Sequence, residues 1–188
     1  MQSSWQRIES WLKTRAPEVL AGLNPPASEQ DIAAAEAVLG VRFPDDFRAL
    51  YLVHDGQSRD APWMMLGWEW LSLESICGES KIWNELLAGN SFGGAENDSD
   101  GTIVRKDWWH PHWIPFTYSG SGDHHCLDLA PGPEGSLGQV IVMWHDDGQR
   151  PVLASSFNEF LTSYAGQLEA GEYVYSSEDN VLLRKDEI

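Results

Sequence analysis

The chain has 188 residues, 42% of them hydrophobic and 22% charged, which is typical of one globular domain. Its 12 lysines and arginines are outnumbered by 29 aspartates and glutamates, for a formal net charge of −17 at pH 7. This acidity excludes nucleic acids and anionic membranes as expected partners, because both bind basic side chains, and it favours a basic protein partner. From two isolated cysteines and the absence of a membrane-length apolar run, we expect a cytoplasmic protein.

Three short helices are predicted in the first third of the chain. Each has a start signal, apolar residues at helical spacing and a stop signal. The second has the clearest signals, since a serine with an acidic residue three positions later forms a capping box and glycine permits a left-handed stop. The starts and stops are, in chain order, Ser4 to Pro17, Ser28 to Gly40, and Pro44 to Gly56.

The middle of the chain changes character. Extended structure from Trp63 leads into a predicted helix over 73–87, whose apolar positions include Ile82, Trp83, Leu86 and Leu87. A loop rich in Gly, Asn and Asp follows at 89–101. Alternating patterns then predict four strands, at 113–118, 124–129, 139–145 and 150–154.

A last helix is predicted from a second capping box at Ser156, with short extended pieces behind it. Consecutive strands joined by hairpins, with helices before and after, indicate an α+β fold. We therefore predict N-terminal helices packed on a mostly antiparallel sheet of about five or six strands, with a helix after the strands. The domain spans 1–188, with a core over about 5–165 and a C-terminal extension over 166–188.

The stretch 120–132, GSGDHHCLDLAPG, has the composition of a metal site. On a strand, alternate side chains point to opposite faces, so His124 and His125 do not bind one ion together. One strand supplies two ligands to a tetrahedral zinc ion, seldom three, and neither HExxH nor CxxC is present. We therefore expect no metal site. The side chains considered as ligands are His110, His112, His124, His125, Cys126 and Asp128.

The same stretch lacks the context for nucleophilic or phosphate chemistry. Ser119 and Ser121 lie near histidines, but no G-x-S-x-G elbow is present, and Cys126 lies in an apolar strand where a thiol is inert. No helix follows the glycines to supply amides for a phosphate, and Asp123 would repel the anion. We expect no catalytic residue and no cofactor, and interpret the stretch as a β-hairpin.

Four ordered stretches resemble the SUKH superfamily, which unites fungal cell-wall-synthesis regulators with bacterial toxin-immunity proteins. They are PPASEQDIAAAEAVLG with FPDDFRALYLVHDG, WLSLESI, WIPFTYSGSGDHHCLDL, and GQVIVMWHD with LASSFNEFL. The insertion at about 89–107 and the tail beyond Gly171 are not covered by the resemblance. Positions that match the family pattern, with structural roles expected, are Pro44, Gly56, Pro115, Gly122, Asp123 and Asp128.

The resemblance implies a non-catalytic protein that binds other proteins. Its main implication is an immunity protein that neutralises a basic toxin domain, such as a nuclease, and the −17 charge favours this. The alternative is a regulatory or scaffold protein in cell-wall synthesis or signalling. A third hypothesis, a metal-dependent hydrolase built on the histidines and Cys126, stays open until metal analysis.

Tryptophans and acidic residues are the expected contacts of a partner, because interface energy is concentrated in a few large aromatic and charged side chains. Among the ten tryptophans, Trp63, Trp68, Trp70, Trp108 and Trp109 are candidates for contacts, against the alternative that they are core residues. The predicted partner-binding residues are Trp68, Glu69, Trp108, Trp109, Asp98, Asp100, Asp146 and Asp147.

Overall fold

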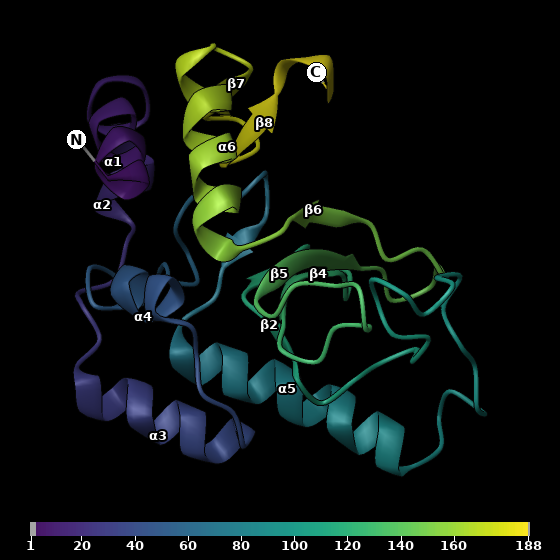
Figure 1. Ribbon diagram of the computed structural model, residues 1–188. Coiled ribbons are helices and arrows are strands. Elements are labelled where there is room, and N and C mark those ends of the chain that lie inside the picture. Colours follow the sequence, from purple (N-terminus) through teal and green to yellow (C-terminus); the bar gives the residue numbers. More distant parts are fainter. Residues whose placement is uncertain (1–2, 188) are drawn as a thin grey trace.

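The computed structural model describes residues 3–187, and it confirms the predicted α+β fold (Figure 1). The helices are α1 (Ser4–Arg15), α2 (Pro17–Ala21), α3 (Glu29–Leu39), α4 (Asp45–Tyr51), α5 (Leu73–Ala88) and α6 (Phe157–Glu169), with the 3₁₀ turn η1 at Lys185–Glu187. The strands are β1 (Glu69–Trp70), β2 (Trp113–Pro115), β3 (Thr117–Tyr118), β4 (His124–Asp128), β5 (Gln139–Met143), β6 (Val152–Ala154), β7 (Tyr173–Ser176) and β8 (Val181–Arg184).

The central sheet is smaller than the sequence predicts. It has four antiparallel strands in the order β2-β4-β5-β6, and not five or six, while β1–β3 and β7–β8 form separate pairs. The predicted strand 113–118 divides at Phe116, whose side chain is buried in the core and whose N–H donates to His125 O at 3.0 Å. Its first half therefore stays in the central sheet and its second half pairs with β1.

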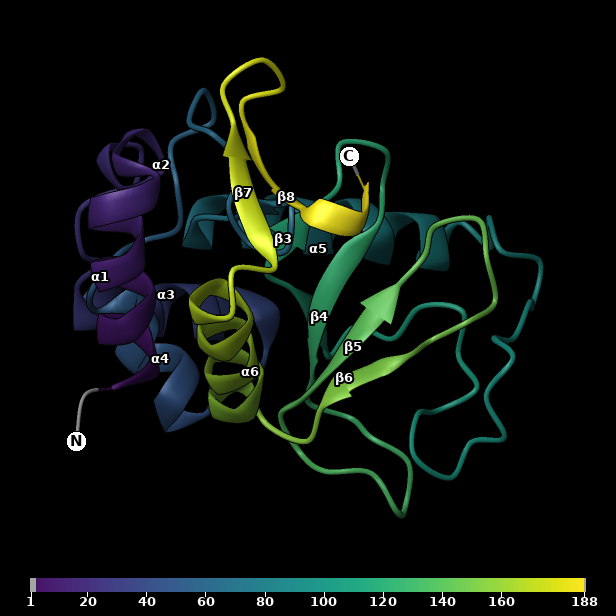
Figure 2. The ribbon, with the colours of Figure 1, turned by 90° about the horizontal axis from the view of Figure 1, so that it is seen from above.

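Helices cover both sides of this sheet. In Figure 1, α3 and α5 lie next to each other below the central sheet and α6 lies above it. Seen from above, α1 lies beside α6, although the two helices are at opposite ends of the sequence (Figure 2). Arg7 of α1 joins them with two hydrogen bonds to the Glu169 carboxylate, at 2.9 and 2.6 Å.

The helix starts follow capping rules. Ser28 and Asp31 form the predicted capping box, and Gly40 ends α3 with φ +68°. The N-cap of α1 is Ser3 and not Ser4, because Gln6, three residues after Ser3, completes the box by accepting the Ser3 N–H at 2.9 Å. The first helix ends before Pro17, which opens α2.

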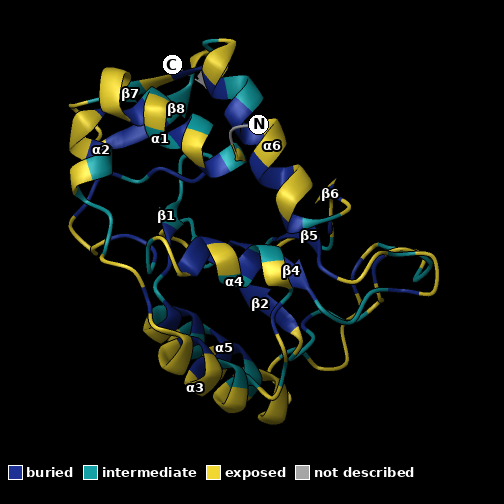
Figure 3. Ribbon diagram, turned by 60° about the vertical axis from the view of Figure 1, so that its left-hand side comes forward, coloured by how far each residue is buried: buried dark blue, intermediate teal, exposed yellow. Residues whose placement is uncertain are grey.

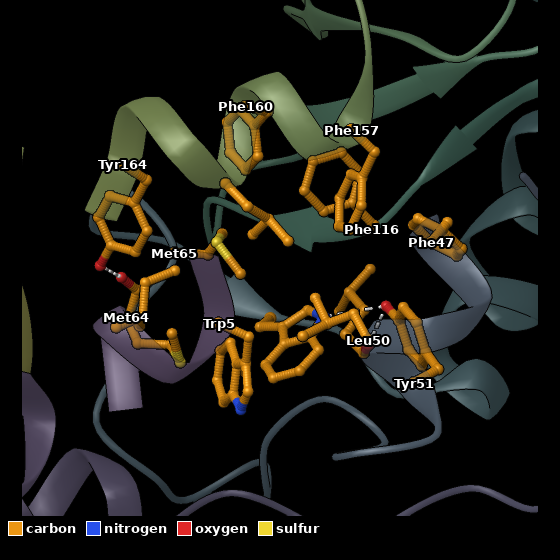
Figure 4. Packing of buried hydrophobic residues seen from close by; sticks show 14 of the residues in the cluster. Trp5, Phe47, Leu50, Tyr51, Met64, Met65, Phe116, Phe157, Phe160 and Tyr164 are labelled. Carbon is orange, nitrogen blue, oxygen red and sulfur yellow. Dashed lines mark hydrogen bonds between the residues drawn. The ribbon is translucent and has the colours of Figure 1, made fainter. Parts of the chain in front are cut away.

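The main core is a cluster of aromatic side chains between α1, α4, α6 and the sheet (Figure 4). Phe47 contacts the rings of Tyr51, Phe116 and Phe157, with centroids 4.8–6.1 Å apart. The Tyr51 hydroxyl donates to Leu71 O at 2.9 Å and accepts the Trp70 indole N–H at 3.0 Å. The buried polar atoms of Tyr51 and Trp70 thus have hydrogen-bond partners.

A second cluster lies on the other face of the sheet, between the sheet, α5 and the loops that follow α5. It consists of Trp83, Val104, Trp109, Trp113, Cys126, Ile141 and Met143. The segment 89–107 contributes Val104 and is held by Asn97, whose side-chain amide donates to Arg105 O and Asp107 O at 2.6 and 2.7 Å. The predicted loop is therefore an ordered part of the structure.

One face of α5 is more exposed than its apolar pattern predicts. Leu73, Ile76 and Trp83 are buried, but Ile82, at 51%, and Leu86, at 37%, are exposed. Figure 3 shows exposed residues along the outer sides of α3 and α5. Apolar positions at helical spacing therefore do not all belong to the core here.

The C-terminal segment packs on the core as the hairpin β7–β8, and Tyr173 and Leu182 are buried there. The Trp63 N–H donates to Asn180 O at 3.0 Å, which joins the hairpin to the start of the middle region. Within residues 3–187, no helix combines the length and the apolar character that a bilayer crossing demands.

Candidate functional site

The turn between β3 and β4 is organised by Asp123. Its carboxylate accepts hydrogen bonds from Ser119 Oγ at 3.0 Å, Ser121 Oγ at 3.1 Å, and His145 N and Nδ1 at 2.9 and 2.8 Å. Burial raises the pKa of Asp123, but these hydrogen bonds outweigh burial and the pKa lies below its ordinary value. The side chain therefore ties the hairpin to the segment that follows β5.

The hydrogen bond to Asp123 also affects the ionisation of His145. Its side chain is 40% exposed, and the hydrogen bond to Asp123 raises the pKa of the imidazole, with a further contribution from Asp146. Asp123, His145 and Asp146 are also the one group of three potential metal ligands within 4.8 Å in the part of the chain that the structure describes. Since both carboxylate oxygens of Asp123 already accept hydrogen bonds, this arrangement is explained by the turn.

We predict that Asp123→Asn lowers the NMR titration midpoint of His145 towards that of an ordinary histidine, because the carboxylate that favours the imidazolium is lost. The more drastic Asp123→Ala is expected to lower the free energy of unfolding by about 1–2 kcal/mol, since four hydrogen bonds from partly exposed donors are lost. Chemical denaturation measures the second effect. An unchanged His145 midpoint in Asp123→Asn would contradict the assigned contact.

The two adjacent histidines point to opposite sides of β4. His124 Nδ1 donates to Thr117 O at 2.7 Å, and its Nε2 accepts the Trp83 indole N–H at 3.0 Å. His125 hydrogen-bonds Thr117 Oγ1 at 2.9 Å and its ring stacks on Trp68 at 4.1 Å. Burial lowers the pKa of His124 to about 4 and that of His125 to about 3, so both are neutral at pH 7.

The remaining members of the metal hypothesis do not form a group of three potential ligands within the described residues. His110 Nδ1 accepts the backbone N–H of His112 at 3.0 Å. The Cys126 thiol is fully buried, and burial raises its pKa well above the ordinary value. Asp128 is also buried and accepts from Ala130 N and Gln139 Nε2 at 2.9 and 2.8 Å. These contacts bind strands and turns together.

Among the described residues, two glutamates on the other side of the hairpin are half-buried without a lysine or arginine in contact. Glu69 lies opposite Tyr118 in β1–β3, and Glu79 of α5 approaches His124 Nε2 at 3.7 Å. Burial raises the pKa of both carboxyl groups, and Arg59 acts on Glu69 from a longer distance. A carboxylate in this environment gains stability from an added cation.

A shallow groove of about 500 Å³ begins at Trp83, one helical turn after Glu79 on α5. Its apolar walls are Trp83, Leu86, Phe92 and Trp108, and His145 lies at its rim. The Trp83 and Phe92 rings stack at 5.8 Å. Aromatic walls next to unneutralised carboxylates are suited to binding another protein, because apolar burial and charge attraction then act together.

Trp109 is a correction to the predicted contacts. It is 1% exposed, stacks on Trp83 at 5.3 Å and donates its indole N–H to Asn84 at 2.9 Å, so it belongs to the second core cluster. Its neighbour Trp108 is half-buried and covers the buried Arg150, whose guanidinium lies 5.0 Å from the indole ring centre. The adjacent tryptophans thus have different environments, although they lie in bends and not on the strand that the prediction assumed.

The other predicted contacts do not form one patch. Trp68 and Glu69 lie at β1, and the exposed Asp146 lies beyond the turn beside His145. Asp98 and Asp147 act electrostatically on Arg150 from the surface, and burial lowers the pKa of that arginine to about 10. Asp100 closes a local turn by accepting from Thr102 N and Oγ1 at 2.8 and 2.6 Å.

Sequence reasoning did not single out Glu79, Tyr118 or Phe92 as site residues, and it assigned Leu86 only to the apolar positions of a helix. The signal that identifies Glu79 and Leu86 is their spacing from Trp83, at i−4 and i+3 on one helix face. Tyr118 and Phe92 join them through contacts between distant segments, which local patterns do not record.

The amino-acid sequence matches a known protein family. Residues 26–163 match the SMI1/KNR4 family, SUKH-1. The chain is 29% identical over 212 residues to the cell wall assembly regulator SMI1 of Saccharomyces cerevisiae, covering 94% of this chain and 42% of that protein. It is 29% identical over 195 residues to the cell wall biosynthesis/cell cycle regulator smi1 of Schizosaccharomyces pombe, covering 97% and 39%.

A mammalian protein is similar as well. F-box only protein 3 of Mus musculus is 32% identical over 184 residues, covering 92% of this chain and 35% of the mouse protein. The chain spans about two fifths of the length of these curated relatives. The two fungal proteins are named as regulators and not as enzymes.

Proposed function

Because this chain belongs to the SMI1/KNR4 family (SUKH-1), we propose that it is a non-catalytic regulatory domain that works by binding another protein. The family match is the observation that carries the proposal. The names of the fungal relatives support regulation of cell-wall assembly more than the toxin-immunity function that the family resemblance also implies. The regulatory function is therefore the one we adopt.

The surface chemistry supports a basic protein as the partner. The chain has a net charge of −17, and Glu69 and Glu79 have no contact with a lysine or arginine of this chain among the described residues. Half-buried aromatic rings next to acidic groups are typical of the residues that dominate protein interfaces. A partner with lysine or arginine beside apolar side chains complements both features.

The proposal is tested by affinity purification of the tagged chain from the cells that naturally make it, with retained proteins identified by mass spectrometry. An unrelated acidic protein of similar charge on the same beads removes proteins held by simple ion exchange. We expect at least one protein to be retained by the chain and not by the control. Retention of none would overturn the proposed function, and retention of a toxin domain would restore the immunity alternative.

Salt provides an independent prediction about that partner. We expect its affinity to fall roughly tenfold between 50 and 500 mM NaCl, mainly through slower association, because salt screens the attraction between an acidic surface and a basic partner. Stopped-flow or surface-plasmon-resonance kinetics measure both rates. An association rate that does not change with salt would show that charge does not guide this partner.

A further inference from the structure

We propose that one continuous surface binds a partner segment that carries a lysine or arginine side chain followed, about 10 Å away, by a bulky apolar side chain. This inference rests on the proposed protein-binding function and names the surface and the partner chemistry. The surface, called the docking strip below, consists of an acidic end, Glu69, Tyr118 and Glu79, and an apolar end, Trp83, Leu86, Phe92 and Trp108.

The two carboxylates of the acidic end have no cationic partner among the described residues of the chain. Glu79 Oε2 lies 3.7 Å from His124 Nε2, but that nitrogen already accepts the Trp83 indole N–H and offers a lone pair, not a proton. Glu69 has no cation within 4.0 Å in the described part of the chain. An incoming ammonium or guanidinium group would therefore meet two carboxylates that lack a partner, and it would offset their desolvation.

The apolar end is a groove lined by aromatic and aliphatic side chains, some of which are exposed to water. Trp83 and Phe92 form its stacked floor, and Trp108 forms a wall above Arg150. Leu86 lines it and is 37% exposed, and Ile82, one turn earlier on α5, is 51% exposed. A leucine, phenylalanine or similar side chain in this groove would cover surface that now faces water.

Helix α5 connects the two ends. Glu79, Trp83 and Leu86 follow each other at spacings of four and three residues, so they lie on one helix face. Glu79 and Leu86 are seven residues apart, which is about 10 Å along a helix axis. In an extended peptide, side chains at i and i+4 share one face about 13 Å apart, a span that the long side chain of Arg or Lys can adjust. The expected pattern is therefore Arg or Lys, three other residues, and then a bulky apolar residue.

Charge complementarity selects this occupant over others. The surrounding surface is acidic, with Asp146 next to His145 at the groove rim and an overall charge of −17. An acidic peptide or a nucleic acid would be repelled by both. A purely apolar peptide would fill the groove but leave Glu69 and Glu79 without a cation.

The test is an NMR titration of the ¹⁵N-labelled full chain with a capped peptide, Gly-Ser-Arg-Ser-Gly-Ser-Phe-Ser-Gly. We expect binding with a dissociation constant on the order of 1 mM, as suits so short a ligand. The shifting signals should be the Trp83 indole N–H and the amides of residues 79–92 and 118–124. Peptides with the Arg replaced by Asp, or the Phe by Ser, should bind roughly tenfold more weakly.

Variants of the chain give the second arm. Glu69→Gln with Glu79→Gln should weaken the Arg-Phe peptide roughly tenfold. The matched control, Glu134→Gln with Glu178→Gln, removes the same charge at exposed positions outside the docking strip and should leave binding almost unchanged. Leu86→Ser is expected to weaken binding, whereas Val38→Ser, at another exposed apolar position, is not.

The outcomes separate this inference from the proposed function. No peptide-induced shifts at 5 mM peptide, on the order of five times the expected dissociation constant, would overturn the docking strip, as would shifts centred outside it or equal binding of all peptides. A partner that is captured from cells and binds the Glu69→Gln, Glu79→Gln chain as tightly as the unaltered chain would also overturn it, while the regulatory function stands. Failure to capture any partner counts against the function itself.

Discussion

Replacing Gly56 by alanine is expected to lower the free energy of unfolding by about 3 kcal/mol or more. Gly56 has φ +65°, and a Cβ there would lie 2.5 Å from the backbone carbonyl atoms of Leu71 and 2.6 Å from Ser72 N. The neighbours are backbone at the start of α5, which is held in place by the hydrogen bond from Leu73 N to Asp55. The added methyl group therefore has no flexible side chain to displace.

Gly40 supplies the matched control for this substitution. Its φ is +68°, nearly the same as that of Gly56, but a Cβ at this position would have no neighbouring atom within 4 Å. Gly40→Ala should therefore cost about 1 kcal/mol, which is the backbone effect without the overlap. Urea denaturation of both variants measures the difference. Equal losses would contradict the close approach between residue 56 and the 71–72 segment.

The second large effect concerns acid. We expect His124 and His125 together to lower the free energy of unfolding by about 2.7 kcal/mol per pH unit between about pH 6 and pH 4. Their pKa values are about 4 and about 3 in the folded chain, below the ordinary 6.5. The unfolded chain therefore binds more protons in this window, so stability is present above pH 6.5 and falls as pH falls.

Some carboxyl groups change the free energy of unfolding with pH in the opposite direction. A variant is therefore needed to isolate the contribution of a histidine. Burial raises the pKa of Asp55, Glu69, Glu79 and Asp128, so the folded chain binds these protons more tightly and gains stability as pH falls. Denaturation of the His125→Gln chain from pH 4 to 7 isolates one histidine. Its slope should be smaller by about 1.4 kcal/mol per pH unit than that of the unaltered chain. An unchanged slope would show that His125 is not buried as a neutral ring.

Local chemistry was sufficient to predict α1, α3, α4, α5 and α6, but the short helix α2 was not predicted. Ser28 with Asp31, the break at Pro17 and the glycine at position 40 act within a few residues, and each lies where the sequence predicts a boundary. The N-cap at Ser3 was missed by one position because two consecutive serines compete, and the partner Gln6 decides between them. Such one-residue choices depend on which side chain completes the cap.

The sheet and the candidate site depend on contacts between distant segments. Phe116 divides a predicted strand because its ring enters the main core and its neighbours pair with different strands. Trp108 and Trp109 have the same residue type and adjacent positions, yet one covers Arg150 and the other packs on Trp83. Both residues lie in bends, so strand alternation does not explain the difference, and only the fold decides which one is buried.

The interpretation of GSGDHHCLDLAPG as a hairpin agrees with the pairing of β2 with β4. What the pattern could not supply is the position of α5 against this hairpin, which brings Glu79 and Trp83 to His124. The docking strip therefore combines residues from segments that are far apart in the sequence, from Glu69 in β1 to Tyr118 in β3. Its acidic end and its groove exist only after folding.

The central claim is that the acidic and aromatic surface beside the hairpin binds a protein partner. Amide hydrogen exchange of the chain, with and without the partner captured from cells, tests this most directly because it reports the whole surface at once. We expect protection of 79–92, 117–124 and 144–146 in the complex. Protection confined to α1, α6 and the β7–β8 hairpin, with these segments unchanged, would contradict the account.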